Sequence, residues 1–281
     1  MGIRIFAGST VDLPKGLRDR LVIVPLMVRF GDEEFIDGVT IKQEEFYNRL
    51  ESSDVPPTTS QPSPNQFREE YEKALKDGDE VIVITVSSKL SGTYQSAVLG
   101  AEGMNHVHII DSKSAAIGEG ALCELALRLL DEGKSAEEMV EILERERENI
   151  IIVAIVDTLE YLERGGRISK TSAFFGGLLS IKPVLTARDG LIVPLGKARG
   201  IKNANNLLIK EIERVGGIDF DKPLVIGYTG NDDEQVKKYI QNTKEIWQGN
   251  LDDPEFVCMG SVIGTHAGPG AVGIAFYKKV D

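Results

Sequence analysis

Short apolar runs alternate with longer amphipathic stretches along the first half of the chain. The runs are typical of buried strands, and the stretches have the spacing of helices that cover a sheet. The expected strands are 3–6, 21–28, 81–86 and 107–111. The expected helices are 42–51, 64–75, 93–102, 114–132 and 135–149. Strands that alternate with helices predict a mostly parallel sheet with helices on both faces.

The second half has a different pattern, which begins with an apolar strand at 150–156. Two further strands flank Asp189-Gly190, a residue pair typical of a hairpin turn. The other expected elements are helices 159–164, 201–215 and 233–242 and strands 224–228, 256–259 and 273–277. A chain of 281 residues exceeds the usual size of one domain. We therefore predict two α/β domains, 1–155 with a mostly parallel sheet and 156–281 with a mixed sheet.

Several residues predict local structure. Pro25 places its strand at a sheet edge or a bulge, because proline has no N–H for the ladder. Thr40 is expected to cap the helix that follows it, and Ser135 to form a capping box with Glu138. Four prolines in the loop 54–64 reduce the entropy lost on ordering, which favours a rigid loop.

The chain carries a net charge of −12, which argues against a nucleic-acid-binding protein. Residues 164–210 differ, with nine basic residues and one acid. This local positive charge suggests a face for an acidic partner or a phosphorylated group, and the alternative is scattered surface cations. No apolar run approaches the ~20 residues that span a bilayer. Because Cys123 and Cys258 lie among apolar residues, we expect reduced thiols and a cytoplasmic protein.

Hydroxyl side chains gather where the expected parallel strands end. The strand 81–86 is followed by Ser91, Gly92 and Thr93 and then by a helix. Free N–H groups at a helix start favour an anion, although Ser91 and Thr93 could simply cap the helix. Ligands of such sheets bind beyond the carboxyl ends of the strands. Seven polar residues fall there: Ser9, Thr10, Ser87, Ser88, Ser91, Asp111 and Ser112.

The three histidines differ in their setting. His106 and His108 lie on one face of a strand but have no carboxylate or cysteine close in sequence, so no metal site is expected. His266 lies in a glycine-rich stretch, 264–273, which we interpret as a loop that a ligand can approach closely. The alternative for His266 is a turn residue that bonds nearby backbone.

Two familiar nucleotide-binding motifs are excluded. The glycines at 268, 270 and 273 match the spacing of the dinucleotide fingerprint, but no helix or later acid follows them. A Walker loop is also absent from the sequence. A serine hydrolase with Ser91, His266 and an acid such as Asp111 stays open as an alternative, although the usual Gly-x-Ser-x-Gly elbow is missing.

Six motifs in order resemble the DegV family, whose characterised members are bacterial fatty acid-binding proteins that serve a fatty acid kinase. The motifs lie at 9–13, 58–63, 90–94, 162–168, 181–185 and 264–270, so the similarity spans essentially the whole chain. The resemblance implies two α/β domains with one long-chain fatty acid in the cleft between them. It also implies a carrier without cofactor or enzymatic activity of its own, and we expect a monomer.

The resemblance assigns residues to this function. It implies that Thr59, Ser91 and His266 hold the carboxylate, with Ser60, Gly92 and Thr93 in the same motifs. The partner kinase would phosphorylate the bound acid and supply phospholipid synthesis. Family arginines that engage the kinase match Arg167, Lys197 and Arg199.

Apolar residues beside these motifs are candidates for the wall around the tail. They are Phe174, Phe175, Leu178, Leu179, Ile181 and Val184, of which Phe174 and Leu178 are the first choices. One departure from the family is Gly8, where members commonly carry an acid. A serine esterase and a carrier of another amphiphile with an acidic head remain the alternatives to a fatty acid carrier.

Overall fold

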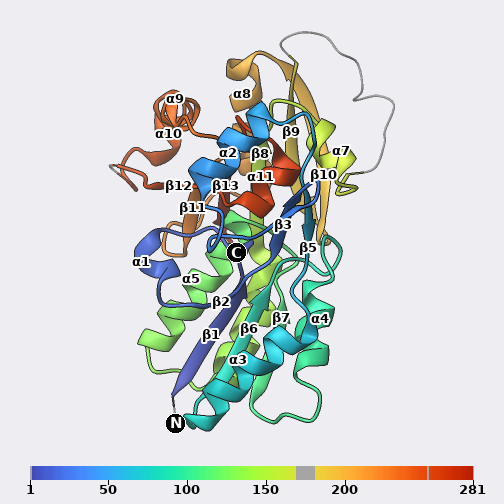
Figure 1. Ribbon diagram of the computed structural model, residues 1–281. Coiled ribbons are helices and arrows are strands. Elements are labelled where there is room, and N and C mark those ends of the chain that lie inside the picture. Colours follow the sequence, from blue (N-terminus) through green and yellow to red (C-terminus); the bar gives the residue numbers. More distant parts are fainter. Residues whose placement is uncertain (1, 169–180, 252, 281) are drawn as a thin grey trace.

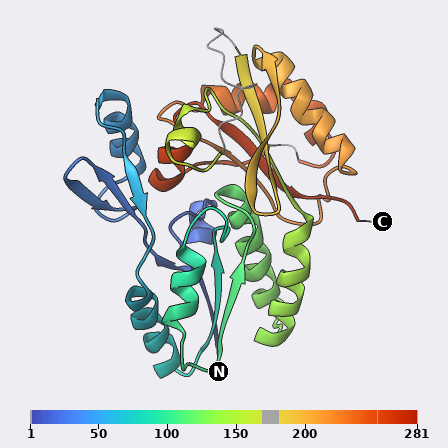
Figure 2. The same cartoon turned by 90° about the vertical axis from the view of Figure 1, so that its right-hand side faces the viewer.

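The computed structural model describes residues 2–168, 181–251 and 253–280. Two large sheets lie one above the other, and a small third sheet stands beside them (Figures 1 and 2). The predicted class, two α/β domains with a parallel and a mixed sheet, is confirmed.

The first sheet is parallel throughout, with the order β2-β1-β6-β7. Its strands are β1 (Ile3–Gly8), β2 (Val22–Val24), β6 (Glu80–Thr85) and β7 (Val107–Asp111). In parallel strands the carboxyl ends share one edge of the sheet. That edge points toward the second sheet (Figure 1), so the hydroxyl residues after β1 and β6 face the space between the domains.

Helices cover both faces of this sheet, as predicted. They are α1 (Lys15–Arg18), α3 (Pro64–Lys76), α4 (Thr93–Gly100), α5 (Ile117–Asp131) and α6 (Ala136–Glu146). On one face, Phe67 and Tyr71 of α3 pack with Phe6 of β1. On the other face, α5 and α6 bury their apolar sides against Ile82 and Ile84 of β6. The predicted capping box at the start of α6 is confirmed.

The second sheet is mixed and has the order β10-β9-β8-β13-β11-β12. Its strands are β8 (Ile150–Ile155), β9 (Ile181–Arg188), β10 (Leu191–Arg199), β11 (Leu224–Tyr228), β12 (Phe256–Cys258) and β13 (Val272–Tyr277). The other elements of this half are η1 (Arg147–Asn149), α7 (Glu160–Arg164), α8 (Ile201–Arg214), α9 (Glu234–Asn242), α10 (Lys244–Trp247) and α11 (Ser261–Ala267). The predicted hairpin at Asp189-Gly190 joins β9 to β10 and is confirmed.

Helix α5 lies between the two large sheets. It contacts β1 and β6 on one side and β8, β11 and β13 on the other. Ile117 and Ala121 are almost fully buried, and the hydroxyl of Tyr277 in β13 donates to the carbonyl of Ala121 at 3.3 Å. One helix therefore belongs to the cores of both domains and sets their spacing.

A small antiparallel sheet stands to one side of the two domains. It has the order β4-β3-β5, with β3 (Met27–Phe30), β4 (Glu33–Ile36) and β5 (Thr58–Ser60), and it carries α2 (Gln43–Ser52). Phe46 and Tyr47 of α2 share a buried cluster with Val262 of α11. Figure 2 shows this lobe in blue, beside the start of the red helix α11.

Three local predictions were wrong for identifiable reasons. The strand expected at 21–28 breaks near Pro25, so that β2 joins the parallel sheet and β3 the small one. Thr40 does not cap α2, because its hydroxyl accepts a hydrogen bond from the N–H of Ile36. His266 does not lie in a loop but in the last turn of α11.

The strand β8 bears on the division between the domains. It ends at residue 155 and lies in the middle of the six-stranded sheet, paired with β13 and β9. Assigned by its sheet, β8 belongs with the second domain. We therefore propose that the domains divide at η1, just before β8, and not after residue 155.

Candidate functional site

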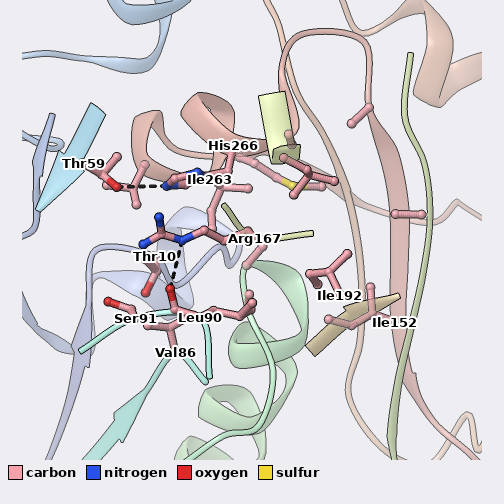
Figure 3. Close-up of a pocket in the computed structure, with 18 of the residues that line it drawn as sticks. Thr10, Thr59, Val86, Leu90, Ser91, Ile152, Arg167, Ile192, Ile263 and His266 are labelled. Carbon is pink, nitrogen blue, oxygen red and sulfur yellow. Dashed lines mark hydrogen bonds between the residues drawn. The ribbon is translucent and has the colours of Figure 1, made fainter. Parts of the chain in front are cut away.

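A cavity of about 450 Å³ lies between the two large sheets. It begins at the carboxyl ends of β1 and β6 and at the N-terminus of α5, and β8, β9, β10 and α11 form its other walls. This volume is within the range of small-molecule sites. Most of the lining is apolar, and the polar side chains gather at one end (Figure 3).

Thr59 and His266 meet at this polar end. Thr59 comes from β5 of the small sheet and His266 from the last turn of α11, 207 positions later. The Thr59 Oγ1 and His266 Nε2 atoms are 2.9 Å apart, which is a hydrogen bond. The structure thus brings together two residues that only the family resemblance had linked.

His266 is held in its neutral form. Burial and the nearby positive charge of Arg167 lower the pKa of His266 from 6.5 to about 4. Its Nδ1 atom is buried and has no hydrogen-bond partner among the described residues. A neutral imidazole has one N–H and one acceptor nitrogen, so only one of its two nitrogens donates.

Ser91 lies at the start of α4 and lines the same cavity. Its hydroxyl is 2.8 Å from that of Thr93 and accepts a bond from the N–H of Thr93 at 3.3 Å. Thr93 itself is fully buried, and neither it nor Gly92 lines the cavity. Gly92 instead leaves room for the side chain of Gln61, which a Cβ at position 92 would meet at 2.2 Å.

Ser60 and Gln61 follow Thr59 and also line the cavity. The amide of Gln61 donates to the hydroxyl of Ser96 in α4 at 3.1 Å. This bond ties the loop after β5 to α4, so Thr59 and Ser91 are held at the same end of the cavity.

Arg167 is the one cation among the cavity-lining residues of the described chain. Its Nε donates to the Leu90 carbonyl at 3.0 Å, and its Nη1 donates to the Gly165 carbonyl. Figure 3 shows the guanidinium between His266 above and Ser91 below. Burial lowers the pKa of Arg167, with no contribution from a carboxylate among the described residues. A half-buried cation without a counter-charge favours a bound anion.

The remaining walls are apolar. They include Ile152 of β8, Val156 just after that strand, Leu185 of β9, Ile192 of β10 and Ile263 of α11. Phe174 and Leu178, the first choices for this wall, lie outside the described residues, as do Phe175 and Leu179. Val184 is buried in the core of the second domain and does not line the cavity, and neither does Ile181.

Lys197 and Arg199 have a different position from Arg167. Both are exposed on β10, which is an edge strand of the second sheet, and neither lines the cavity. They stand two residues apart on one strand, so their side chains leave the same face of the sheet. The family resemblance groups these three residues as kinase contacts. The structure places Arg167 in the cavity wall and leaves Lys197 and Arg199 on the exposed edge of β10.

The hydrogen bonds do not favour a catalytic triad. Ser91 pairs with Thr93, and the His266 Nε2 pairs with Thr59, so the serine and the imidazole each have another partner. A base in a triad also needs an acceptor for its second nitrogen, and the His266 Nδ1 has none among the described residues.

The described residues contain neither a metal-site cluster nor a membrane-spanning helix. Glu80 lies 3.6 Å from His106 and 3.7 Å from His108, a carboxylate that sequence reasoning did not place there. Within the described ranges, no group of three or more such side chains has the arrangement of a metal site. No helix in those ranges is long and apolar enough to cross a bilayer.

Sequence reasoning missed three features of the cavity. The sequence indicates only a strand-end hydroxyl at Thr10, part of a motif at Gln61 and a partner contact at Arg167. A fourth residue, Glu119, gave no signal at all, because it lies in the first turn of an apolar helix. Its Oε2 atom forms a hydrogen bond of 2.8 Å with the hydroxyl of Thr10, and the side chain is fully buried.

Known proteins resemble this chain along its whole length. The family model described as "Uncharacterised protein, DegV family" matches residues 2–279. A DegV domain-containing protein of Caldanaerobacter subterraneus is 38% identical, with 99% of each chain covered. A DegV family protein of Thermus thermophilus, whose structure is described as fatty acid binding, is 36% identical with a TM-score of 0.87 and covers 99% of this chain and 100% of its own. DegV of Bacillus subtilis, described as a fatty acid binding protein, is 30% identical with a TM-score of 0.82 and the same coverage. The chain therefore belongs to the DegV family.

Proposed function

We propose that this chain binds one long-chain fatty acid in the cavity between its two domains. The carboxylate lies at the polar end and the tail along the apolar walls. The observation that carries the proposal is Arg167, a half-buried cation without a described counter-charge at the polar end of a mostly apolar cavity. The fatty acid binding described for the relatives from Thermus thermophilus and Bacillus subtilis supports it.

The polar end offers a consistent set of donors. If the His266 Nε2 carries the proton of the neutral ring, it donates to Thr59 Oγ1. The hydroxyl hydrogen of Thr59 is then free for the ligand, because one hydroxyl donates only once. Ser91 and the N–H groups of Arg167 complete the set. Charge-assisted bonds of this kind offset the cost of removing a carboxylate from water.

The tail supplies most of the affinity in this proposal. Each buried methylene is worth about 0.8 kcal/mol, so roughly ten methylenes contribute about 8 kcal/mol before the costs of association. The lining side chains of β8, β9 and β10 are apolar except for Thr186, whose hydroxyl donates to the carbonyl of Ile152 at 2.7 Å. A ligand with a charged head and a long apolar tail matches this division of the cavity.

We also propose that the chain is a carrier, which acts in the cytoplasm as a monomer and presents the bound acid to a fatty acid kinase. The exposed cations Lys197 and Arg199 on β10 support a docking face for an acidic surface, since the chain as a whole is acidic. In the described part of the chain, Ser91 bonds to Thr93 and His266 to Thr59, so both side chains are available as ligand contacts.

The binding proposal is tested by titrating the protein with palmitic acid, its methyl ester and hexadecylamine. We expect saturable binding of one acid per chain, weaker binding of the ester and weakest binding of the amine, which repels Arg167. Equal affinity for all three would refute the proposed head-group site. Preference for an acidic amphiphile other than a fatty acid would identify the alternative carrier.

The docking proposal needs the kinase and a separate variant. We expect Arg199→Glu to slow phosphorylation of the bound acid while leaving its dissociation constant unchanged. Lys76→Glu, a charge reversal on the exposed end of α3, is the matched control. Transfer at the wild-type rate in Arg199→Glu at low salt would place the docking face elsewhere.

A further inference from the structure

A buried acid stands directly behind the polar end of the cavity. Thr10 lines the cavity, and its Oγ1 lies 2.8 Å from the Oε2 of Glu119. Thr10 is 2% exposed and Glu119 is 0% exposed. Glu119 belongs to the first turn of α5, the helix shared by both cores, so its carboxyl is fixed in place beneath Thr10.

Thr10 lies at the same end as the other head-group residues. Figure 3 shows Thr10 next to Ser91 and below Arg167. The contacts of Gly8 agree, because a Cβ there would lie 3.3 Å from Thr10 Oγ1 and 3.7 Å from Thr93, the hydrogen-bond partner of Ser91. Thr10 therefore lines the cavity on the side where Ser91 and Arg167 lie.

The second oxygen of Glu119 has no partner. Its Oε1 atom is buried and makes no hydrogen bond with the described residues. An ionised carboxylate in such a place would be left largely unsolvated, which is costly. Burial accordingly raises the pKa of Glu119 well above its ordinary value. This outweighs the pull of the α5 N-terminus, which favours the ionised form.

The protonation of Glu119 decides what Thr10 offers to the cavity. If Glu119 is ionised, Thr10 must donate its only hydrogen inward, and its lone pairs then face the ligand. If Glu119 is protonated, its O–H can donate to Thr10 Oγ1, and the hydroxyl of Thr10 rotates to donate outward. The first arrangement repels a carboxylate and the second binds it.

We propose that Glu119 is a positioning residue that makes Thr10 a hydrogen-bond donor to the head group of the bound acid. The inference rests on the proposed function, because it needs a carboxylate at the polar end. Glu119 does not touch the ligand and acts only through Thr10. The pair adds a fourth side-chain donor to the three that come from Thr59, Ser91 and Arg167.

Other charged groups around Glu119 influence its titration. Asp12 after β1 and Asp111 at the end of β7 raise its pKa, and Arg18 of α1 lowers it. Cys123, one turn further along α5, has its own pKa raised by burial and by Glu119. Asp12 must be controlled for, because burial raises its pKa to about 8. His266, with a pKa of about 4, stays neutral throughout neutral and alkaline solution.

The test is the affinity for palmitic acid from neutral to alkaline pH, where the ligand remains ionised. For the wild type we expect the affinity to fall as Glu119 loses its proton, by about tenfold, which is the worth of one hydrogen bond to a charged group. Glu119→Gln should bind equally well across this range, because its amide donates to Thr10 at every pH. Thr10→Val should bind about tenfold more weakly at neutral pH and lose the decline, while Thr10→Ser should keep both the affinity and the decline.

Two comparisons make the outcome decisive. Asp12→Asn removes a buried acid that raises the pKa of Glu119, and it should keep the decline, shifted to lower pH. The Thr10→Val, Glu119→Gln double variant should bind no more weakly than Thr10→Val alone, since Glu119 acts through Thr10. A decline of wild-type size in Glu119→Gln, or full affinity in Thr10→Val, would overturn the inference. If Glu119→Gln does not fold, the Thr10 variants decide the question. Failure of the wild type to bind any fatty acid would instead overturn the proposed function itself.

Discussion

Arg167→Met separates the binding role of this residue from any structural one. The substitution removes the guanidinium while keeping an unbranched side chain of similar reach. Without a ligand, the wild-type arginine is a half-buried cation whose hydrogen bonds to described residues go to the carbonyls of Leu90 and Gly165. Its removal therefore loses two hydrogen bonds and also relieves an unpaired charge. With a carboxylate bound, the same change removes the counter-charge.

The expected magnitude follows from Coulomb's law. Two unit charges about 4 Å apart at an effective dielectric constant of about 20 attract by roughly 4 kcal/mol. Partial solvation of the half-buried Arg167 reduces this to about 2–4 kcal/mol, or a loss of affinity between about thirtyfold and several hundredfold. The free energy of unfolding without ligand should change by no more than about 1 kcal/mol, because the lost bonds and the relieved charge oppose each other.

The assay is displacement of a fluorescent fatty acid, together with urea unfolding of the ligand-free protein. Arg164→Met is the matched control, since Arg164 is exposed three residues earlier and does not line the cavity. We expect wild-type affinity in the control and weak binding in Arg167→Met, with both variants folded. Equal affinity in the two variants would show that Arg167 is not the counter-charge of the ligand.

Three further predictions concern the cavity. Thr59→Val should weaken acid binding about tenfold, because it removes the hydroxyl that His266 orients, and should leave binding of the methyl ester nearly unchanged; equal losses for both ligands would contradict this. Ala154→Leu fills part of the space beside the apolar wall, so the protein should prefer a shorter acid. Each methylene that is displaced should cost about 0.8 kcal/mol of binding free energy. An unchanged preference for chain length would place the tail elsewhere. Folding lowers the pKa of His266 from 6.5 to about 4. As the pH falls, His266 therefore takes up a proton in the unfolded protein before it does so in the folded protein. The ligand-free protein should therefore lose roughly 3 kcal/mol between pH 6.5 and about pH 4 relative to His266→Asn, and parallel acid profiles would show that His266 is not buried as a neutral ring.

Much of the fold follows from local sequence patterns. The parallel strands, the helices that cover them and the hairpin at Asp189-Gly190 are set by periodicity and turn chemistry, which act over a few residues. The break at Pro25 shows the limit of that reasoning. Proline predicted an irregular strand, but β3 enters a different sheet because it pairs with its neighbour β4 and with the distant β5.

The site was harder to predict than the fold. The hydroxyl of Ser91 was expected at a strand end, yet its relation to Thr59 and His266 depends on how the small sheet and α11 pack. The histidine appeared to lie in a loop because glycines surround it, while burial against the neighbouring lobe stabilises a short helix there. Glu119 could not be found from sequence, since an acid in the first turn of a helix is ordinarily a surface residue.

The roles of the basic residues also depended on tertiary structure. In the sequence, each of Arg167, Lys197 and Arg199 is simply one positive charge in the same basic region, 164–210. Burial separates them, because Arg167 turns into the cavity wall and the other two remain on the exposed edge of β10.

The most direct test of the central claim is to denature the purified protein and identify by mass spectrometry what it releases. A carrier of this kind should release long-chain fatty acid at close to one molecule per chain, and Arg167→Met should release much less. Release of no lipid by the wild type, together with hydrolysis of model esters that depends on Ser91, would contradict the account.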